Sequence, residues 1–133
     1  MNNILILGSL PETENRKKFY ELITRIAEKH ASVVNSPIDT AEFEGSNKER
    51  YDRAFNLVKE ADLIIGEQSN PSTGQGMEIR EAAILEKPLI VIAKEGSKIS
   101  GLVRDCPITR DIVYYTDFVK LEFELTKSIK NIF

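Results

Sequence analysis

The sequence has little of the side-chain chemistry that many small enzymes and metal proteins use. Cys106 is the only cysteine and His30 the only histidine among 133 residues. We therefore expect no disulfide framework, no thiolate zinc site and no histidine-based catalytic triad within one chain. Catalytic chemistry must come mainly from carboxylates, hydroxyls and the backbone, and we expect neither a metal nor a cofactor.

Positive charge and long apolar runs are also scarce. Lys and Arg number 18 against 21 for Asp and Glu, which gives a net charge of -3. This balance argues against non-specific binding to nucleic acid or to membrane surfaces. The apolar run in MNNILILGSL (1–10) is too short to span a bilayer and lacks the basic segment and cleavage pattern of a signal peptide. We expect a cytoplasmic protein whose partner is a small molecule.

What the chain does have is enough apolar sequence for one core. Apolar residues make up 41% and charged residues 29% of the composition. These values are typical of a globular protein, and the length suits one domain that needs no disulfide or metal to fold. We therefore predict a single domain over residues 1–133.

Short apolar runs predict the strands. NILILG (3–8), DLIIGE (62–67) and KPLIVIAK (87–94) have the form of buried parallel strands. ASVVNS (31–36) is a weaker strand candidate and DIVYY (111–115) a better one.

The segments between these runs have a different period. Apolar residues recur at helical spacing over 19–27, 51–58 and 118–132, which predicts three amphipathic helices. The stretch 35–47 is polar and rich in turn-forming residues, and we predict a loop there.

Strands that alternate with helices imply right-handed βαβ units and a parallel sheet covered on both faces. We predict an α/β, doubly wound domain of the flavodoxin/Rossmann-like kind, with five parallel strands in the order 2-1-3-4-5. Ligands of such sheets bind at the carboxyl ends of the strands, at the switch point between the first and third strands. The loops GSLPE (8–12) and EQSNPSTGQGME (67–78) meet there.

The second loop holds a carboxylate behind a glycine-rich turn. Gly74 and Gly76 free the backbone and allow a ligand to approach, and Glu78 follows them at the start of a helix. The N–H groups and dipole of that helix start favour an anion, either a ligand phosphate or Glu78 itself, which we expect to stay ionised. In the alternative, Ser72 and Gln75 form a capping box and Glu78 only complements the dipole. The turn matches neither the dinucleotide fingerprint nor the P-loop.

The motifs together resemble a known family. The segment 61–105, ADLIIGEQSNPSTGQGMEIREAAILEKPLIVIAKEGSKISGLVRD, and the opening ILILGSL (4–10) are similar to the 2′-deoxynucleoside 5′-phosphate N-hydrolases of the nucleoside 2-deoxyribosyltransferase superfamily. The most specific part is PSTGQGME (71–78). The resemblance implies that Glu78 is a nucleophile that attacks C1′ of the sugar and forms a glycosyl-enzyme, which water then hydrolyses.

The resemblance also implies a substrate site. It assigns phosphate contacts to small hydroxyls and backbone amides, with Ser100 reaching the site of a neighbouring subunit of a homodimer. The substrate-binding residues expected from it are Gly8, Ser9, Leu10, Glu67, Ser72, Gly74, Gly76 and Ser100. Each serine also has a structural alternative, since Ser9 and Ser72 suit turns and Ser100 could cap a short helix.

Some positions depart from the family pattern. Ala54 stands where the family has an aspartate, and the nearest acid, Asp52, lies two residues away, on roughly the opposite face of a helix. Asp52, Glu67 or Asp39 could compensate, or the base could leave as an anion, and we retain Asp52 beside Glu78 as a candidate catalytic residue.

The first loop and first strand depart as well. Pro11 and Glu12 replace the arginine and glycines of the hydrolase loop, and Leu5 replaces an aromatic residue. The missing arginine would suit a nucleoside or another N-glycoside in place of a nucleotide.

Three functions follow from these residues. The first is hydrolysis of the N-glycosidic bond of (deoxy)nucleoside 5′-monophosphates, which releases free base and sugar 5-phosphate. The second is base exchange between nucleosides through the same intermediate, as in the deoxyribosyltransferases. The third is a non-catalytic nucleotide-binding module, for which Ala54 is the argument.

Overall fold

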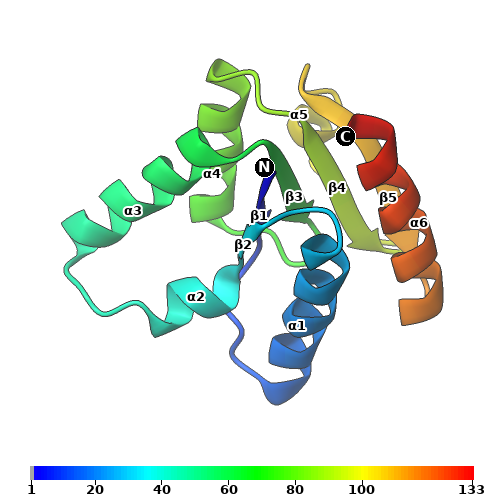
Figure 1. The fold of residues 1–133 in the computed structure, drawn as a ribbon, viewed down its shortest axis with the longest axis horizontal. Helices are drawn as coiled ribbons and strands as arrows, with labels where there is room; N and C mark the ends of the chain where they lie inside the picture. The colour runs from blue at the N-terminus through cyan, green and yellow to red at the C-terminus, as the bar shows by residue number, and fades with distance from the viewer. Residues whose placement is uncertain (1) are drawn as a thin grey trace.

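The computed structural model describes residues 2–133 and consists of one parallel sheet between two layers of helices (Figure 1). Five strands pair in the order β2-β1-β3-β4-β5, and every pair is parallel. This confirms the predicted α/β fold and strand order. The strands are β1 (Asn3–Leu7), β2 (Val33–Asn35), β3 (Leu63–Glu67), β4 (Leu89–Lys94) and β5 (Thr109–Tyr115).

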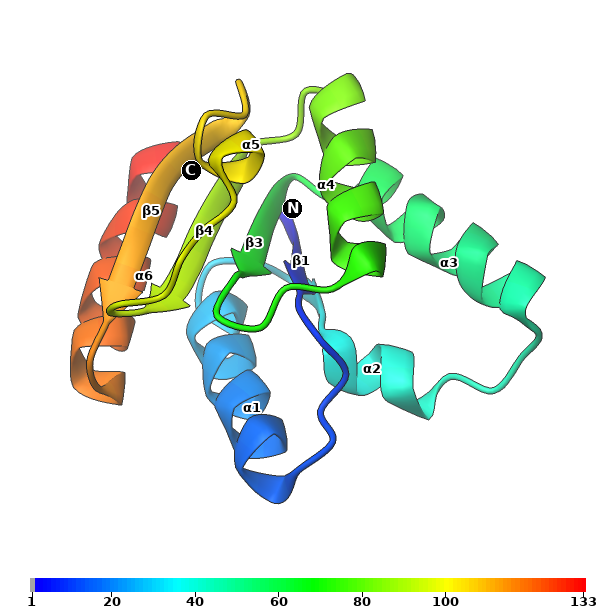
Figure 2. The ribbon, with the colours of Figure 1, turned by 180° about the vertical axis from the view of Figure 1, so that it is seen from behind.

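In the described part of the chain, six helices connect and cover these strands (Figure 2). The three helices predicted from the apolar spacing are present, as is the helix that begins at the glycine-rich turn. The helices are α1 (Glu14–Glu28), α2 (Pro37–Glu42), α3 (Asn47–Glu60), α4 (Thr73–Ile84), α5 (Gly101–Arg104) and α6 (Phe118–Ile132).

The prediction of a loop over 35–47 was wrong, because α2 lies within it. Ser36 caps this helix, and its side chain accepts a hydrogen bond from the backbone N–H of Ile38. The Asp39 carboxylate accepts one in return from the backbone N–H of Ser36, at 2.8 Å. With Pro37 at the first helical position, these residues form a capping box that stabilises a helix of only six residues.

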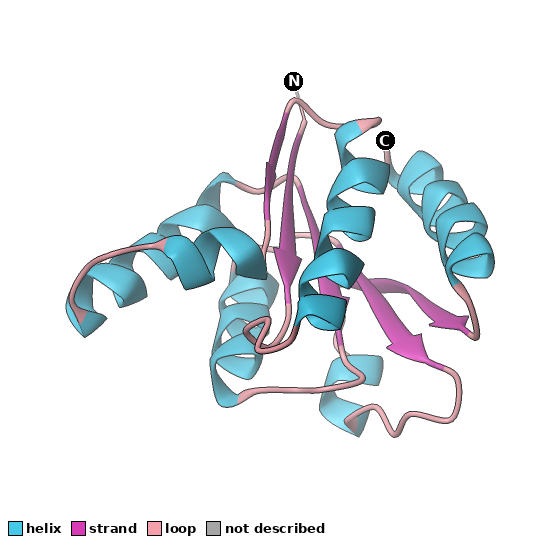
Figure 3. Ribbon diagram, turned by 90° about the horizontal axis from the view of Figure 1, so that it is seen from below, coloured by secondary structure: helices cyan, strands magenta, loops and turns pink. Residues whose placement is uncertain are grey.

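Successive side chains of β1 point to opposite faces of the sheet and pack against different helix layers. Ile4 and Ile6 face a core built with α1 and α6, while Leu5 and Leu7 face a second core built with α3, α4 and α5. Figure 3 shows the strands between helices on both sides. Central strands buried on both faces need continuous apolar runs, which explains why the sequence marked β3 and β4 so clearly.

The topology brings two chain segments together at the carboxyl edge of the sheet. Leu7, the last residue of β1, pairs with Gly66, near the end of β3. The loop after β1 and the turn that leads into α4 therefore start side by side. Within residues 2–133, none of the helices combines the length and hydrophobicity that a membrane span requires.

Candidate active site

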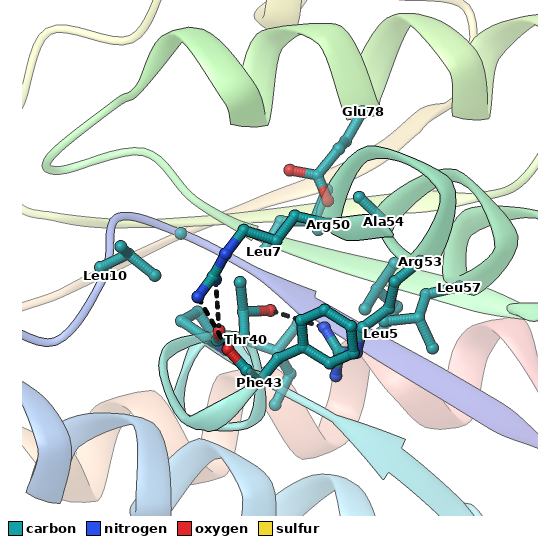
Figure 4. A pocket seen from close by; sticks show the side chains of 13 residues that line it. Leu5, Leu7, Leu10, Thr40, Phe43, Arg50, Arg53, Ala54, Leu57 and Glu78 are labelled. Carbon is teal, nitrogen blue, oxygen red and sulfur yellow. Dashed lines mark hydrogen bonds between the residues drawn. The ribbon is translucent and has the colours of Figure 1, made fainter. Parts of the chain in front are cut away.

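A small cavity lies at the carboxyl end of β1, between α2, α3 and α4 (Figure 4). Its volume is about 70 Å³. This is well below the roughly 300–1,000 Å³ of ordinary ligand pockets, so it can enclose only part of a ligand. Its walls are Leu5, Ile6, Leu7, Gly8, Leu10, Pro37, Thr40, Phe43, Arg50, Arg53, Ala54, Leu57 and Glu78.

Glu78 is the one acid among these wall residues of the described chain. Its carboxylate extends from α4 toward α3 (Figure 4), and no residue within 2–133 donates a hydrogen bond to it. Burial raises the pKa of Glu78 to about 7, and the nearby charge of Arg53 partly opposes the rise. A carboxylate with this pKa is half ionised near neutral pH, and no described residue forms a hydrogen bond with it that a ligand would have to replace.

This pKa corrects the expectation that Glu78 stays fully ionised because of the helix start. Glu78 is the sixth residue of α4, and no acid lies in its first turn. The unpaired N–H groups and the dipole act mainly within that first turn, so they do not offset the cost of burying the charge.

The turn before α4 is fixed by the sheet and only partly by the predicted cap. Ser72 does cap the helix and accepts a hydrogen bond from the backbone N–H of Gln75, at 3.2 Å. Gln75, however, does not complete a capping box. Its buried side chain donates to the carbonyl oxygen of Glu67 at 2.9 Å and accepts from Gln68 Nε2 at 2.6 Å. The start of α4 is therefore attached to β3.

Gly8 matters because of what a side chain would meet. A Cβ atom at Gly8 would overlap the hydroxyl oxygen of Tyr20, whereas one at Gly74 would make only an ordinary contact with Glu78 Oε1, at 4.0 Å. Gly8 thus allows Tyr20 to pass beneath the first loop, where its hydroxyl donates to the carbonyl oxygen of Ser9 at 2.7 Å. Arg16 in turn donates to the Tyr20 hydroxyl at 3.0 Å, so the loop is anchored to α1.

Glu67 occupies a different environment from Glu78, although both were expected near the crevice. Its side chain is fully buried and does not line the cavity. Tyr115 donates to Glu67 Oε2 at 2.9 Å, and the backbone N–H of Ser69 donates to Oε1. Burial and the adjacent Glu67 carboxylate raise the pKa of Tyr115. Glu67 is thus a hydrogen-bonded structural acid and not a solvated strand end.

The other acids proposed to compensate for Ala54 also point elsewhere. Asp52 is exposed and forms an ion pair with Lys48, with 2.9 Å between Nζ and Oδ2. It does not line the cavity, because two residues along α3 rotate it away from the face that carries Ala54. Asp39 is engaged in the capping box of α2. Within the described chain, neither aspartate shares the cavity with Glu78.

The sequence reasoning missed the wall opposite Glu78. Arg50 donates to the backbone carbonyls of Thr40 and Phe43, at 3.2 and 2.7 Å, and Arg53 donates to Thr40 Oγ1 at 3.1 Å. Both guanidinium groups lie over the Phe43 ring, at 5.8 and 5.3 Å from its centroid. The signals were the capping-box pattern at Ser36 and the i, i+3 spacing of the arginines, which places both on one helix face.

Ser100 lies outside this cavity within one chain. It precedes α5 at the capping position, but its side chain makes no capping hydrogen bond and is exposed. With Gly76 and the 88% exposed Leu102 it lines an open groove between α4 and α5. Within residues 2–133, no group of three or more His, Cys, Asp or Glu side chains is arranged to hold a metal ion.

Comparison with known proteins supports the resemblance seen in the sequence. A scan against models of known families gives no match. The chain is 22% identical over 111 residues to the 5-hydroxymethyl-dUMP N-hydrolase of Rattus norvegicus, an alignment that covers 77% of this chain and 68% of the relative. The resemblance to nucleotide N-hydrolases is thus confirmed by a comparison over most of the chain.

Two solved structures share the fold. The CMP N-glycosidase of Clostridium botulinum superposes with a TM-score of 0.71 and 20% identity, covering 93% of this chain and 97% of that one. The 2-deoxyribosyltransferase of Bacillus psychrosaccharolyticus gives a TM-score of 0.68 and 21% identity, with coverage of 92% and 95%. These similarities show the fold.

Proposed function

We propose that this protein hydrolyses the N-glycosidic bond of (deoxy)nucleoside 5′-monophosphates with Glu78 as nucleophile. The observation that carries the proposal is a carboxylate to which no residue of 2–133 donates a hydrogen bond, with a pKa of about 7, in a cavity at the carboxyl end of β1, beside the switch point of the sheet. The names of the relatives, a nucleotide N-hydrolase and a CMP N-glycosidase, support the reaction class.

In the proposed reaction an ionised Glu78 oxygen attacks C1′ as the bond to the base breaks. The transition state has oxocarbenium character, so the carboxylate both stabilises its positive charge and traps it as an ester. Water then attacks C1′ and releases the sugar phosphate and Glu78. Burial of Glu78 serves this step, because a poorly solvated carboxylate loses little hydration on approaching the sugar.

The cavity suggests how the substrate lies. At about 70 Å³ it can enclose only part of a nucleotide, so the phosphate belongs outside, toward the loops of Gly8, Ser9 and Ser72. Backbone N–H groups and hydroxyls there can hold a dianion without a basic cluster. Leu10, whose side chain is 51% exposed and lines the cavity mouth, would cover the sugar.

The proposal includes a second subunit. The Ser100 hydroxyl makes no capping hydrogen bond and lies in an open groove beside exposed Leu102 and Gly76. Such a groove suits an interface through which Ser100 reaches the phosphate of a neighbouring site. Sedimentation equilibrium of the wild type and of Leu102→Asp tests this, since a monomeric wild type would contradict it. The cytoplasmic location and the single domain over 1–133 stay predictions from the sequence.

A second candidate is a non-catalytic nucleotide-binding module. The observation in its favour is that Ala54 brings no acid to the cavity and that Asp52 is paired with Lys48 outside it. Base exchange between nucleosides is a third outcome of the same chemistry, if a base replaces water at the glycosyl-enzyme.

The deciding experiment measures free base by chromatography after incubation with ribo- and deoxyribonucleoside monophosphates and nucleosides, with Glu78→Gln in parallel. Release that requires Glu78 supports hydrolysis, and an added labelled base that enters the product identifies exchange. Tight nucleotide binding without release, equal in both proteins, would establish the binding module instead.

A further inference from the structure

The proposed reaction leaves one need that no acid of the cavity fills. When the C1′–N bond breaks, its electron pair moves onto the base, and a general acid that neutralises this charge typically contributes about 10²- to 10⁴-fold. Glu78 is occupied as the nucleophile, and Ala54 has no polar side-chain atom. The wall residues that do carry charge opposite Glu78 are Arg50 and Arg53.

These two arginines differ in how they are used. Arg50 donates to the backbone carbonyls of Thr40 and Phe43. It thereby holds the α2 segment, which is α2 with its capping residues Ser36 and Phe43, against α3. Arg53 makes a single hydrogen bond among the described residues, to Thr40 Oγ1. Since a guanidinium has five N–H donors, most donors of Arg53 are available to a ligand.

Arg53 is also electrostatically connected to the nucleophile. Of the two arginines, only Arg53 lowers the pKa of Glu78, so its charge lies close enough to act within the cavity. It adjoins Ala54 on α3 and stacks over Phe43, which limits its freedom to move. A fixed cation beside the space for the base meets the requirement for stabilising charge that develops there.

We propose that Arg53 stabilises the departing base as an anion and thereby replaces the general acid that Ala54 does not supply. This inference rests on the proposed N-glycosidase function and assigns its leaving-group step. It defines the substrate class as nucleotides whose base has a carbonyl oxygen conjugated with the glycosidic nitrogen, since a guanidinium donates hydrogen bonds but has no acceptor.

The step balances without an added reagent. Glu78 forms the C1′–O bond with its own electron pair, and the electrons of the broken C1′–N bond spread from the nitrogen onto the carbonyl oxygen. Arg53 donates a hydrogen bond to that oxygen and keeps its proton. The released base anion takes a proton from solvent, and the water that hydrolyses the ester returns a proton to solvent.

The test compares Arg53→Gln with Arg50→Gln on a series of 5-substituted deoxyuridine monophosphates, from 5-fluoro to 5-methyl, whose bases differ in acidity. We expect Arg53→Gln to lower kcat by about 10²-fold for the least acidic base and by about tenfold for the most acidic one. Arg50→Gln should lower kcat by a similar factor for every base, because both described hydrogen bonds of Arg50 hold the backbone of Thr40 and Phe43 and its donors are committed there. Arg53→Lys should restore part of the loss.

Thermal unfolding of each variant checks that it folds. If the loss in Arg53→Gln is the same for every base, Arg53 only shapes the cavity and the inference is wrong, while release that depends on Glu78 in the wild type keeps the proposed function. If the wild type releases no base at all, both fall together. As a second variant, Ala54→Asp added to Arg53→Gln should recover release with an activity that declines at high pH, as a true general acid requires.

Discussion

Two glutamates at the same edge of the sheet have opposite environments. Glu67, at the end of β3, is fully buried, and both of its carboxylate oxygens accept hydrogen bonds from within the chain. Glu78, on α4, is only partly buried, yet no described residue donates to it, and burial raises its pKa to about 7. Burial alone therefore does not identify a reactive carboxylate.

The difference lies in whether partners are supplied. A buried carboxylate with donors on both oxygens adds stability and cannot turn toward a substrate without losing them. A carboxylate without donors costs stability and gains reactivity, and such groups persist where function requires them. Four tests address this contrast.

Turnover should change more than any other property. Glu78→Gln should lower kcat for base release by at least about 10³-fold, because the amide is a poor nucleophile. Glu67→Gln should keep kcat within roughly tenfold once the protein is folded, since Glu67 does not line the cavity. Single-turnover base release measures both. Equal losses in the two variants would end the distinction between them.

The pH dependence of activity should follow Glu78. In the proposed reaction only ionised Glu78 attacks, and its pKa of about 7 applies to the protein without substrate, so kcat/KM should rise about tenfold per pH unit below pH 7 and level off above pH 8. The ratio between pH 8 and pH 5 is then about 10². Glu67→Gln should show the same profile. A midpoint near 4.5, the ordinary value for glutamate, would contradict the environment assigned to Glu78.

Stability should respond with opposite signs at the two sites. Tyr115→Phe removes a donor from buried Glu67 and should lower the free energy of unfolding by about 1–3 kcal/mol. The native pKa of Glu78 lies above its unfolded value, so the wild type loses stability as the pH rises from 4.5 to 7. Glu78→Gln should therefore be more stable than the wild type by about 2 kcal/mol at pH 8, allowing for solvent screening, and no more stable at pH 4.

Urea unfolding of the three proteins at both pH values measures these effects. A loss of stability in Glu78→Gln at pH 8 would show that the carboxylate has stabilising partners after all. Phe at position 115 keeps the ring, so a loss there reports on the hydroxyl.

The smallest effect is expected at Asp52. Its exposed ion pair with Lys48 contributes roughly 0.3–0.5 kcal/mol at most, and it does not face the cavity. Asp52→Asn should change kcat by less than about twofold, as a surface substitution away from the site would. A loss near 10²-fold would mean that Asp52 turns into the cavity when substrate binds, and it would then be a third kind of acid beside the other two.

The sequence predicted the sheet well because buried parallel strands leave an unmistakable apolar pattern. It also singled out Glu78, which lines the cavity, although Gly74 and Gly76 lie in the first turn of α4 and not before it. The catalytic role of Glu78 stays a prediction. It failed at α2, where a short helix depends on a capping box and has no apolar stripe long enough to detect. Phe43 and the arginines of α3 were missed for the same reason, because their role depends on where α2 lies.

The sequence also could not predict the hydrogen bonds of Glu67 or the pKa of Glu78. In the sequence Glu67 has the pattern of a polar residue at a strand end. Its partner Tyr115 lies 48 residues away on β5, and only the folded sheet brings the two together. The pKa of Glu78 depends on how deeply α3 and α4 enclose it, a property of packing that spacing along one helix does not contain.

The attachment of Gln75 to β3 has a consequence for how this protein could be altered. The turn that leads to Glu78 is bonded to the sheet, whereas the opposite wall is joined to α3 by hydrogen bonds from Arg50 and Arg53 alone among those described. The two walls are thus held by different sets of hydrogen bonds. Substitutions in α2 should therefore change the preferred ligand while leaving Glu78 in its original position.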